Sequence, residues 1–331
     1  MIYALLVFAG SSIRAVEMYH RAVKSSERRA SEIVWDVHKA SSFDEFLLSW
    51  SSERPARGSF TFAISICVHH NWSPWFPYAV WGSQEQHLYG IQSSRDIRDF
   101  LNGRKASGFR VKVVATNGAS FKSMRALHVT ITDNNKHAVS SKLPETTTAV
   151  LEVPQISQIA LELDDSTRIC SPTSTAAAVS YLVPHHEIDV VEFAQQVFEP
   201  RAKLYGAWVL NTVQAAHELG RNWYCYVSRL GSLQDLVDQI NRGYPIVVSI
   251  QGPIPGSARP TNENVKFAYE SGHLLVVRGY DAVHKKVLCM DPAFHTDAET
   301  YVSYDAEDFI TAWRRRNGLA YIFTKTLPVR K

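Results

Sequence analysis

Cysteine is scarce in this chain, with only four cysteines among 331 residues. No two of them form a CxxC pair, so the sequence offers neither a disulfide framework nor a zinc-binding motif. The histidine pairs His69-His70 and His185-His186 lack a matching third ligand nearby and are interpreted as turn residues. We therefore expect no metal and no other cofactor.

An excess of charge of one sign is also missing. The net charge is only +3, which is too small to indicate a nucleic-acid or membrane partner. The basic runs at 24–29 and 314–316 are short, and solvated faces account for both. These features favour a peptide or protein substrate as the partner and leave the oligomeric state open.

Long hydrophobic runs are absent as well. The apolar stretch 2–9 is too short to span a bilayer, and nothing later is longer, so a soluble protein is expected. That stretch is either a weak secretion signal without its usual positive charge or a first buried strand. The localisation is accordingly cytoplasmic or exported.

What the chain does contain is enough apolar material for two cores. It is 45% hydrophobic and 20% charged, and 331 residues exceed the usual size of one domain. The polar, proline-containing stretch 143–148 marks the expected boundary. We predict a lead-in over 1–35 (a weak signal, or a helix over about 14–32), a β-sandwich domain over 36–147, and a catalytic domain over 148–331.

The sandwich prediction rests on short alternating segments separated by turn residues. Residues 60–68 place Phe60, Phe62 and Ile64 on one face, and 110–115 and 126–132 repeat the alternation. Several such strands indicate an all-β sandwich. The nearby aromatic residues are either a flat platform for a sugar or peptide or, as we favour, core residues. They are Trp50, Trp72, Trp75, Tyr78 and Trp81.

Beyond residue 148 the pattern predicts helices first and an antiparallel sheet afterwards, which is an α+β arrangement. Helices are expected over 170–182, 190–198, 207–219, 232–242 and 305–316, and strands over 245–250, 274–280, 287–290 and 320–324. Pro172 fits a first helical turn, so Cys170 stands at the start of the first helix. The helix dipole would stabilise a thiolate there. A small buried hydrophobic residue is the alternative role for this cysteine.

Two downstream residues fit a nucleophilic cysteine. His273 begins the strand after Gly272, and Asp291 ends the next strand before Pro292. A turn between these strands would place His273 and Asp291 side by side, with the second ring nitrogen facing Cys170. Asp281 is the rival carboxylate, but it lies at the turn. A nucleophile, a base and an orienting acid predict a cysteine hydrolase.

The chain also resembles a known family, on motifs that extend over 150–325. They are Val-Pro-Gln-Ile-Ser-Gln at 153–158, Cys-Ser-Pro-Thr-Ser at 170–174, Leu-Tyr-Gly-Ala-Trp at 204–208, Gly-Tyr-Pro-Ile-Val-Val-Ser-Ile at 243–250, Gly-His-Leu at 272–274 and Asp-Pro at 291–292. These segments resemble bacterial papain-like cysteine peptidases of the bacteriocin-leader-processing type, in particular their soluble peptidase-like members with an N-terminal β-sandwich. The family more often has Cys-Gly-Pro where this chain has Cys170-Ser171-Pro172.

The resemblance implies a papain-like α+β catalytic domain in which Cys170, His273 and Asp291 form the triad. It implies that Gln158 donates to the oxyanion, with Gln155 as the alternative because about a dozen residues separate Gln158 from Cys170. We expect the segment 252–270 to form one wall of the cleft opposite Trp208, which is either a substrate-side aromatic or a core residue.

Hydrolysis of peptide or isopeptide bonds through a thioester is the predicted function. Two alternatives on the same fold remain: a transglutaminase-like acyltransferase, and a catalytically idle binding protein.

Overall fold

The computed structural model describes residues 15–327 except 90–96, 162, 186–187, 253, 255–268 and 271. The apolar stretch 2–9 lies outside the described residues, as does most of the predicted cleft wall over 252–270. Within the described part of the chain, no helix is long and apolar enough to cross a membrane.

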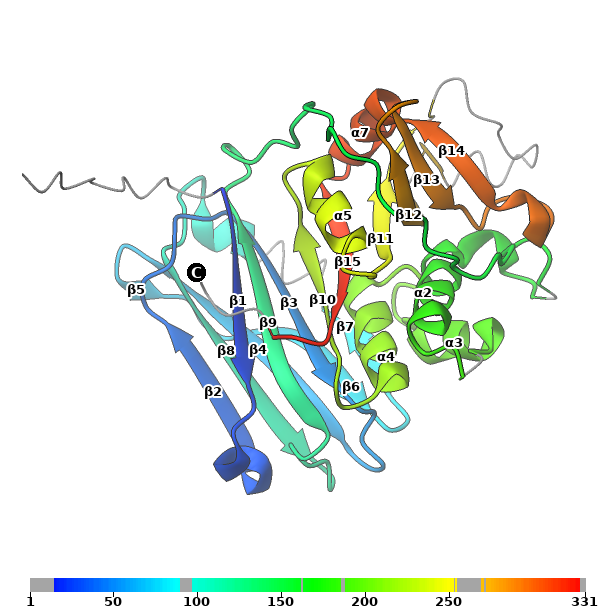
Figure 1. Ribbon diagram of the computed structural model, residues 1–331. Helices are drawn as coiled ribbons and strands as arrows, with labels where there is room; N and C mark the ends of the chain where they lie inside the picture. Colours follow the sequence, from blue (N-terminus) through cyan, green and yellow to red (C-terminus); the bar gives the residue numbers. More distant parts are fainter. Residues whose placement is uncertain are drawn as a thin grey trace, which may run out of the picture.

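The first part of the chain is built from two antiparallel sheets (Figure 1). One has the order β1-β9-β3 and the other has the order β2-β8-β4-β6-β7, with β5 paired to β4. Their bounds are β1 Val16–Ala22, β2 Glu32–Val37, β3 Glu45–Ser52, β4 Ser59–Val68, β5 Asn71–Trp72, β6 Phe76–Gly82, β7 Gln86–Leu88, β8 Gly108–Thr116 and β9 Met124–Thr132.

The two sheets share one apolar core because their strands alternate inward and outward residues. Trp50 of β3 stacks on Phe62 of β4 with ring centroids 4.0 Å apart, and both are buried. The core role predicted for the aromatic residues is confirmed for Trp50 and Trp81, but it is wrong for Trp75, which is 37% exposed. Lys112 lies over the ring of Trp75, so this tryptophan packs on the outer face of the sheet.

The helix predicted over residues 14–32 is wrong. This segment forms β1, the 3-10 helix η1 (Ser25–Arg29) and the start of β2. Its residues tolerate a helix, but β1 pairs with β9 from Val16↔Thr132 to Ala22↔Ala126, and Tyr19 is buried against Phe109. Tertiary pairing therefore overrides the local preference.

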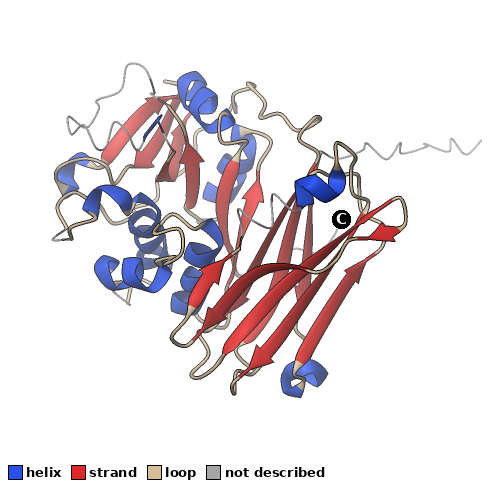
Figure 2. Cartoon of the chain, turned by 180° about the vertical axis from the view of Figure 1, so that it is seen from behind, coloured by secondary structure: helices blue, strands red, loops and turns tan. Residues whose placement is uncertain are grey.

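The second part contains a sheet with the order β10-β15-β11-β12-β13-β14, and helices pack on it. The helices are α2 Cys170–Leu182, α3 Val190–Val197, α4 Trp208–Leu219, α5 Leu233–Ile240 and α7 Ala306–Arg314. The strands are β10 Tyr224–Arg229, β11 Ile246–Ile250, β12 His273–Asp281, β13 Lys286–Met290, β14 Tyr301–Asp305 and β15 Leu319–Thr324. Figure 2 shows these helices gathered at one end of the molecule, beyond the long strands of the first part.

The two parts are joined along the outer edge of β10. β10 pairs with β15 on one side, and its other edge faces the sheet β1-β9-β3. Ser51 accepts from the Cys225 N–H at 2.9 Å, Ser49 accepts from the Val227 N–H at 3.2 Å, and Thr130 donates to the Val227 carbonyl at 2.9 Å. Side chains of one sheet thus satisfy backbone groups that an edge strand would otherwise leave unpaired.

Candidate active site

Cys170 is the first residue of α2, as the sequence predicts. This residue is 8% exposed, and the helix that it begins is buried from Cys170 to Val179. Ser171 and Tyr321 share a hydrogen bond of 2.9 Å, and Ser174 donates to the Leu274 carbonyl at 3.1 Å. These two contacts fix the start of the helix against β15 and β12, so the position of the sulfur is set by rigid elements.

His273 begins β12, directly after Gly272. Gly272 has a φ of 125°, a conformation that side-chain-bearing residues rarely adopt, and it turns the chain into the strand. The imidazole is fully buried and its Nε2 lies 2.8 Å from Oδ1 of Asp291. The hairpin of β12 and β13 therefore brings His273 and Asp291 together, as the sequence predicts.

Asp291 follows β13 and is also fully buried. Besides His273, its carboxylate accepts from the Ala293 N–H at 3.0 Å and from the hydroxyls of Tyr269 and Tyr304, each at 2.6 Å. Burial alone would raise the pKa of Asp291, but the positive charge of His273 and these hydrogen bonds outweigh burial and lower it. The carboxyl group is thus held ionised.

Cys170 is the second group that acts on the imidazole of His273. Among the described residues, Nδ1 of His273 has no hydrogen-bond partner, while the Cys170 side chain is near enough to influence the pKa of the ring. Burial would lower the pKa of His273, whereas the Asp291 carboxylate and then the Cys170 side chain raise it to about 10. The arrangement favours an imidazolium at neutral pH. An imidazolium beside a cysteine is a ready proton donor and a partner for a thiolate.

Gln158 contacts residues that are close in sequence to Asp291 and to Cys170. Its N–H donates to the Pro292 carbonyl, and its side-chain Nε2 donates to the Ser166 carbonyl, both at 2.8 Å. Ser166 begins the 3-10 helix η2 (Ser166–Arg168) that leads into Cys170. Among the described residues this is the one bond that the Gln158 side-chain amide makes, and its Oε1 is buried without a partner. Gln155 instead donates to the carbonyls of Asp297 and Ala298, so Gln158 is the better placed of the two.

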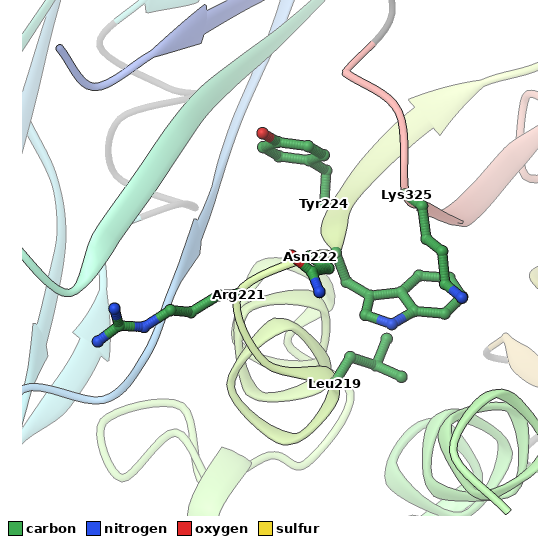
Figure 3. A pocket seen from close by; sticks show the side chains of 6 residues that line it. Leu219, Arg221, Asn222, Tyr224 and Lys325 are labelled. Carbon is green, nitrogen blue, oxygen red and sulfur yellow. The ribbon is translucent and has the colours of Figure 1, made fainter.

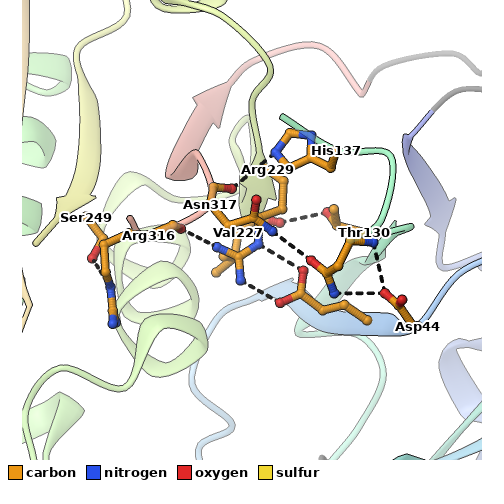
Figure 4. Close-up of polar contacts among 10 residues, drawn as sticks. Asp44, Thr130, His137, Val227, Arg229, Ser249, Arg316 and Asn317 are labelled. Carbon is orange, nitrogen blue, oxygen red and sulfur yellow. Dashed lines mark hydrogen bonds and ion pairs between the residues drawn. The ribbon is translucent and has the colours of Figure 1, made fainter. Parts of the chain in front are cut away.

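Trp208 is the first residue of α4 and is half-buried. The guanidinium groups of Arg229 and Arg316 each lie 5.7 Å from its ring. Arg316 also donates to Ser249 at 3.2 Å, a contact drawn in Figure 4. Two guanidinium groups therefore lie near the Trp208 ring, an arrangement that the sequence does not indicate.

Sequence reasoning also missed the tyrosines of the site. Tyr269 and Tyr304 donate to Asp291, and the ring of Tyr269 packs on His273 with centroids 4.4 Å apart. Tyr269 comes four residues before His273 in the chain, and this closeness was the one sequence feature that could have indicated its contact with the site. Tyr304 comes from β14, a strand that the sequence analysis did not identify.

A cavity away from these residues offers no competing chemistry. It has a volume of about 460 Å³ and is lined by Leu219, Trp223 and Lys325 among others (Figure 3). None of its lining residues is a cysteine, a histidine or a carboxylate. In the described ranges, moreover, no group of three or more His, Cys, Asp or Glu side chains could hold a metal ion.

A cysteine at the start of a helix and a buried pair of histidine and aspartate at the ends of two strands are the features that the sequence predicts for a cysteine-type peptidase. The model of the Peptidase_C39 like family matches residues 150–321, and the chain belongs to this family. These residues contain Cys170, His273, Asp291, Gln158 and Trp208. The protein is accordingly a cysteine-type peptidase.

Two solved structures are similar to this chain. A putative C39-like peptidase from Bacillus anthracis is 20% identical, with a TM-score of 0.41 over 55% of this chain and 100% of that chain. Xylellain, a cysteine protease from Xylella fastidiosa, is 13% identical, with a TM-score of 0.32 over 60% of this chain and 94% of that chain. The chain matches no curated protein.

Proposed function

We propose that the protein hydrolyses peptide or isopeptide bonds with Cys170 as nucleophile, His273 as base and acid, and Asp291 as the orienting acid. One observation carries this proposal. The buried imidazole of His273 lies 2.8 Å from the Asp291 carboxylate through Nε2, and Asp291 and the Cys170 side chain both raise its pKa. The Asp291 carboxylate that contacts His273 is ionised and accepts four hydrogen bonds. A cysteine that served only for packing would not need such a histidine and aspartate pair.

The first half-reaction forms a thioester. The Cys170 thiolate attacks the carbonyl carbon of the substrate, so a C–S bond forms and the carbonyl oxygen takes the negative charge. The C–N bond then breaks, and the His273 imidazolium gives its proton to the leaving amine. Its pKa of about 10 means that His273 carries this proton at neutral pH.

Gln158 supplies the oxyanion donor in this proposal. The second hydrogen of its amide and a backbone N–H at the start of α2 would share the negative charge of the tetrahedral intermediate. The bond from Gln158 to the Ser166 carbonyl supports this role, since it orients the amide without using both hydrogens.

The second half-reaction regenerates the enzyme. Neutral His273 accepts a proton from water, the hydroxide attacks the thioester carbonyl, and the C–S bond breaks. The acyl group leaves as a carboxylic acid, the thiolate is restored, and His273 is again an imidazolium. An amine that replaced water in this step would make the enzyme a transglutaminase-like acyltransferase.

We further propose that residues 148–331 form a papain-like α+β domain and that the preceding part is a β-sandwich domain. The α2 helix packed against β12 supports the first assignment. The antiparallel pairing within the two front sheets, β1-β9-β3 and β2-β8-β4-β6-β7, supports the second. The strands β1 and β2 extend the sandwich into the region before residue 36.

Alkylation with a fluorescent iodoacetamide at mildly acidic pH tests the nucleophile. We expect Cys170 to react faster than a free thiol, because a thiolate paired with an imidazolium persists where ordinary thiols are protonated. Cys67→Ala is the matched control, since Cys67 is 6% exposed and Cys170 is 8% exposed. Cys170→Ala should abolish both the fast labelling and the release of free amine from peptides.

The release of free amine from peptides, measured with and without an added acceptor amine, separates the alternatives. Amine release that needs water alone supports the hydrolase, whereas incorporation of an added acceptor amine into the product supports the acyltransferase. Labelling of Cys170 no faster than a free thiol would contradict both enzymatic mechanisms and favour a binding protein.

A further inference from the structure

Arg316 lies beside the backbone of the proposed catalytic histidine. It follows α7, in the turn that leads into β15. A Cβ atom added to Gly272 would stand 3.3–3.5 Å from the carbon and two nitrogens of the Arg316 guanidinium. Since Gly272 immediately precedes His273, the cation lies one residue away from the proposed base.

Arg316 and Cys170 both act electrostatically on the hydroxyl of Tyr321. The Tyr321 hydroxyl bonds to Ser171, the residue after Cys170. Burial raises the pKa of Tyr321 and the Ser171 bond lowers it, while Cys170 and Arg316 act on it from opposite directions, the first raising and the second lowering it. Both groups are therefore within electrostatic range of one hydroxyl.

The charge of Arg316 is not neutralised by the described residues. Arg229, its neighbour, forms a bidentate ion pair with Glu45 and donates to the Arg316 carbonyl at 2.6 Å (Figure 4). Arg316 itself donates only Nε, to Ser249, and in the described part of the chain neither of its Nη groups has an acceptor. The N–H groups that Arg316 does not use within the described part of the chain are free to bind an anion, and a guanidinium binds carboxylates through paired N–H donors.

We propose that Arg316, with Trp208 beside it, forms a subsite that binds a carboxylate of the substrate next to the scissile bond. This inference rests on the proposed function and names its substrate class: peptides that carry an acidic side chain near the cleaved bond or a free C-terminal carboxylate close to it. The planar guanidinium presents paired N–H donors that match a carboxylate. The Trp208 ring would cover the alkyl part of the same residue.

The experiment compares cleavage of matched peptides by mass spectrometry. A proteome-derived peptide library, offered with free and with amidated C-termini, identifies the bonds cut by the full-length protein. Peptides for the preferred bond are then made with Glu or Gln at the selected position, and with a free or an amidated terminus. A preference for Glu assigns the subsite to a side chain, and a preference for the free acid assigns it to the chain end.

The Arg316→Gln variant should reduce the ratio of kcat/KM for the carboxylate peptide over its amide by about 10- to 100-fold, the range expected for a hydrogen bond to a charged group. Arg316→Lys should keep part of the preference, and Arg316→Glu should favour a Lys peptide over a Glu peptide. Arg221→Gln is the control for net charge. Arg221 is exposed beyond the far end of α4, about 20 Å from Trp208 along the helix axis.

Failure of the two proposals can be told apart. If the wild type cuts peptides with no carboxylate preference, or if the ratio is unchanged in Arg316→Gln, the subsite is refuted and the peptidase mechanism stands. If the wild type cuts nothing, calorimetry with Cys170→Ala decides. Binding of Glu peptides that is tighter than Gln peptides, and is lost on adding Arg316→Gln, supports the subsite, and equal binding refutes it.

Discussion

Two histidines of this protein, the buried His273 and the half-buried His20, each face a hydrogen-bonding partner at nearly the same distance. Nε2 of His273 lies 2.8 Å from Oδ1 of Asp291, and Nδ1 of His20 lies 2.9 Å from Nδ1 of His128. The first pair is in the peptidase region. The second lies between β1 and β9, where the ring of Tyr226 from β10 packs on both histidines.

The imidazoles of the two pairs differ in charge at neutral pH: His20 and His128 are neutral, whereas His273 is protonated. Burial lowers the pKa of His20 to about 4 and lowers the pKa of His128 well below its usual range. Burial acts on His273 in the same direction, but the Asp291 carboxylate raises its pKa to about 10. The comparison teaches that a buried imidazole is neutral by default, and that a fixed carboxylate is what makes one a proton donor.

The chemistry follows from this difference. If His20 and His128 were both protonated, the two Nδ1–H groups would point at each other with no acceptor between them. The pair is therefore suited to packing between the two parts of the molecule and not to donating a proton. His273 can hold a proton at neutral pH because Asp291 is itself ionised by four donors. Proton donation to a leaving amine requires the second arrangement.

Replacing Asp291 with Asn should make the His273 imidazole neutral at pH 7, as His20 and His128 are, and so remove the difference between the two pairs. We expect kcat to fall on the order of ten-thousandfold, as when the orienting acid of a Ser-His-Asp triad is changed to Asn. Removing the negative charge also lowers the pKa of His273. The alkaline limb of the pH–rate profile should therefore move to lower pH, which steady-state kinetics between about pH 5 and 10 would measure.

Asp281→Asn is the matched control. Asp281 pairs with His284 at 2.7 Å in the exposed turn of the same hairpin. The loss of this surface pair should leave kcat/KM and the alkaline limb unchanged. An Asp291→Asn enzyme with wild-type activity would show that His273 needs no carboxylate.

The His20–His128 pair should make the fold sensitive to acid. The unfolded chain binds protons at His with a pKa of about 6.5, whereas folded His20 does so only near pH 4. Stability should thus fall as the pH falls from about 6.5 to 4, by about 3 kcal/mol for His20 alone. His273 has the opposite sign: its stabilisation is present below pH 6.5 and is lost as the pH rises toward 10.

The variant His20→Asn sharpens this point. Asn keeps a polar group near the position of Nδ1 but does not titrate in this range, so the acid sensitivity should decrease. Urea unfolding at pH 7 and pH 5 measures the free energy of unfolding at each pH. An equal loss in wild type and variant would place the acid-sensitive group elsewhere.

The sequence predicted the local parts of the site well. The helix that starts at Cys170 was predicted from Pro172 and the alanines after it, and the β12–β13 hairpin from two apolar runs that flank a turn. These features depend on neighbours in the chain, so a single sequence specifies them. The roles of Cys170, His273, Asp291 and Gln158 remain predictions for the experiments above.

The distant contacts could not be predicted in the same way. β1 was predicted as part of a helix because its residues suit either conformation, and only pairing with β9 decides. Arg316 belongs to a basic run that was interpreted as a solvated face. Nothing in that run distinguishes it from Arg314 and Arg315, because its position depends on where Gly272 and Ser249 lie in the fold.

The smallest effect is expected for a variant that removes one of the two tyrosine hydroxyls bound to Asp291 and keeps the charge of the carboxylate. Tyr304→Phe removes one donor to Oδ2 but keeps the ring, so the pKa of Asp291 rises toward its usual value. Because the low pKa of Asp291 stabilises the fold above about pH 4, the variant should lose about 1–2 kcal/mol at pH 7 and less at acid pH. The kcat should fall less than tenfold, since Tyr269 still donates to the same oxygen. Tyr301→Phe is the control on the same strand, because its hydroxyl donates to the Val153 carbonyl instead. A Tyr304→Phe enzyme as inactive as Asp291→Asn would mean that the hydroxyl, rather than the carboxylate charge, keeps His273 protonated.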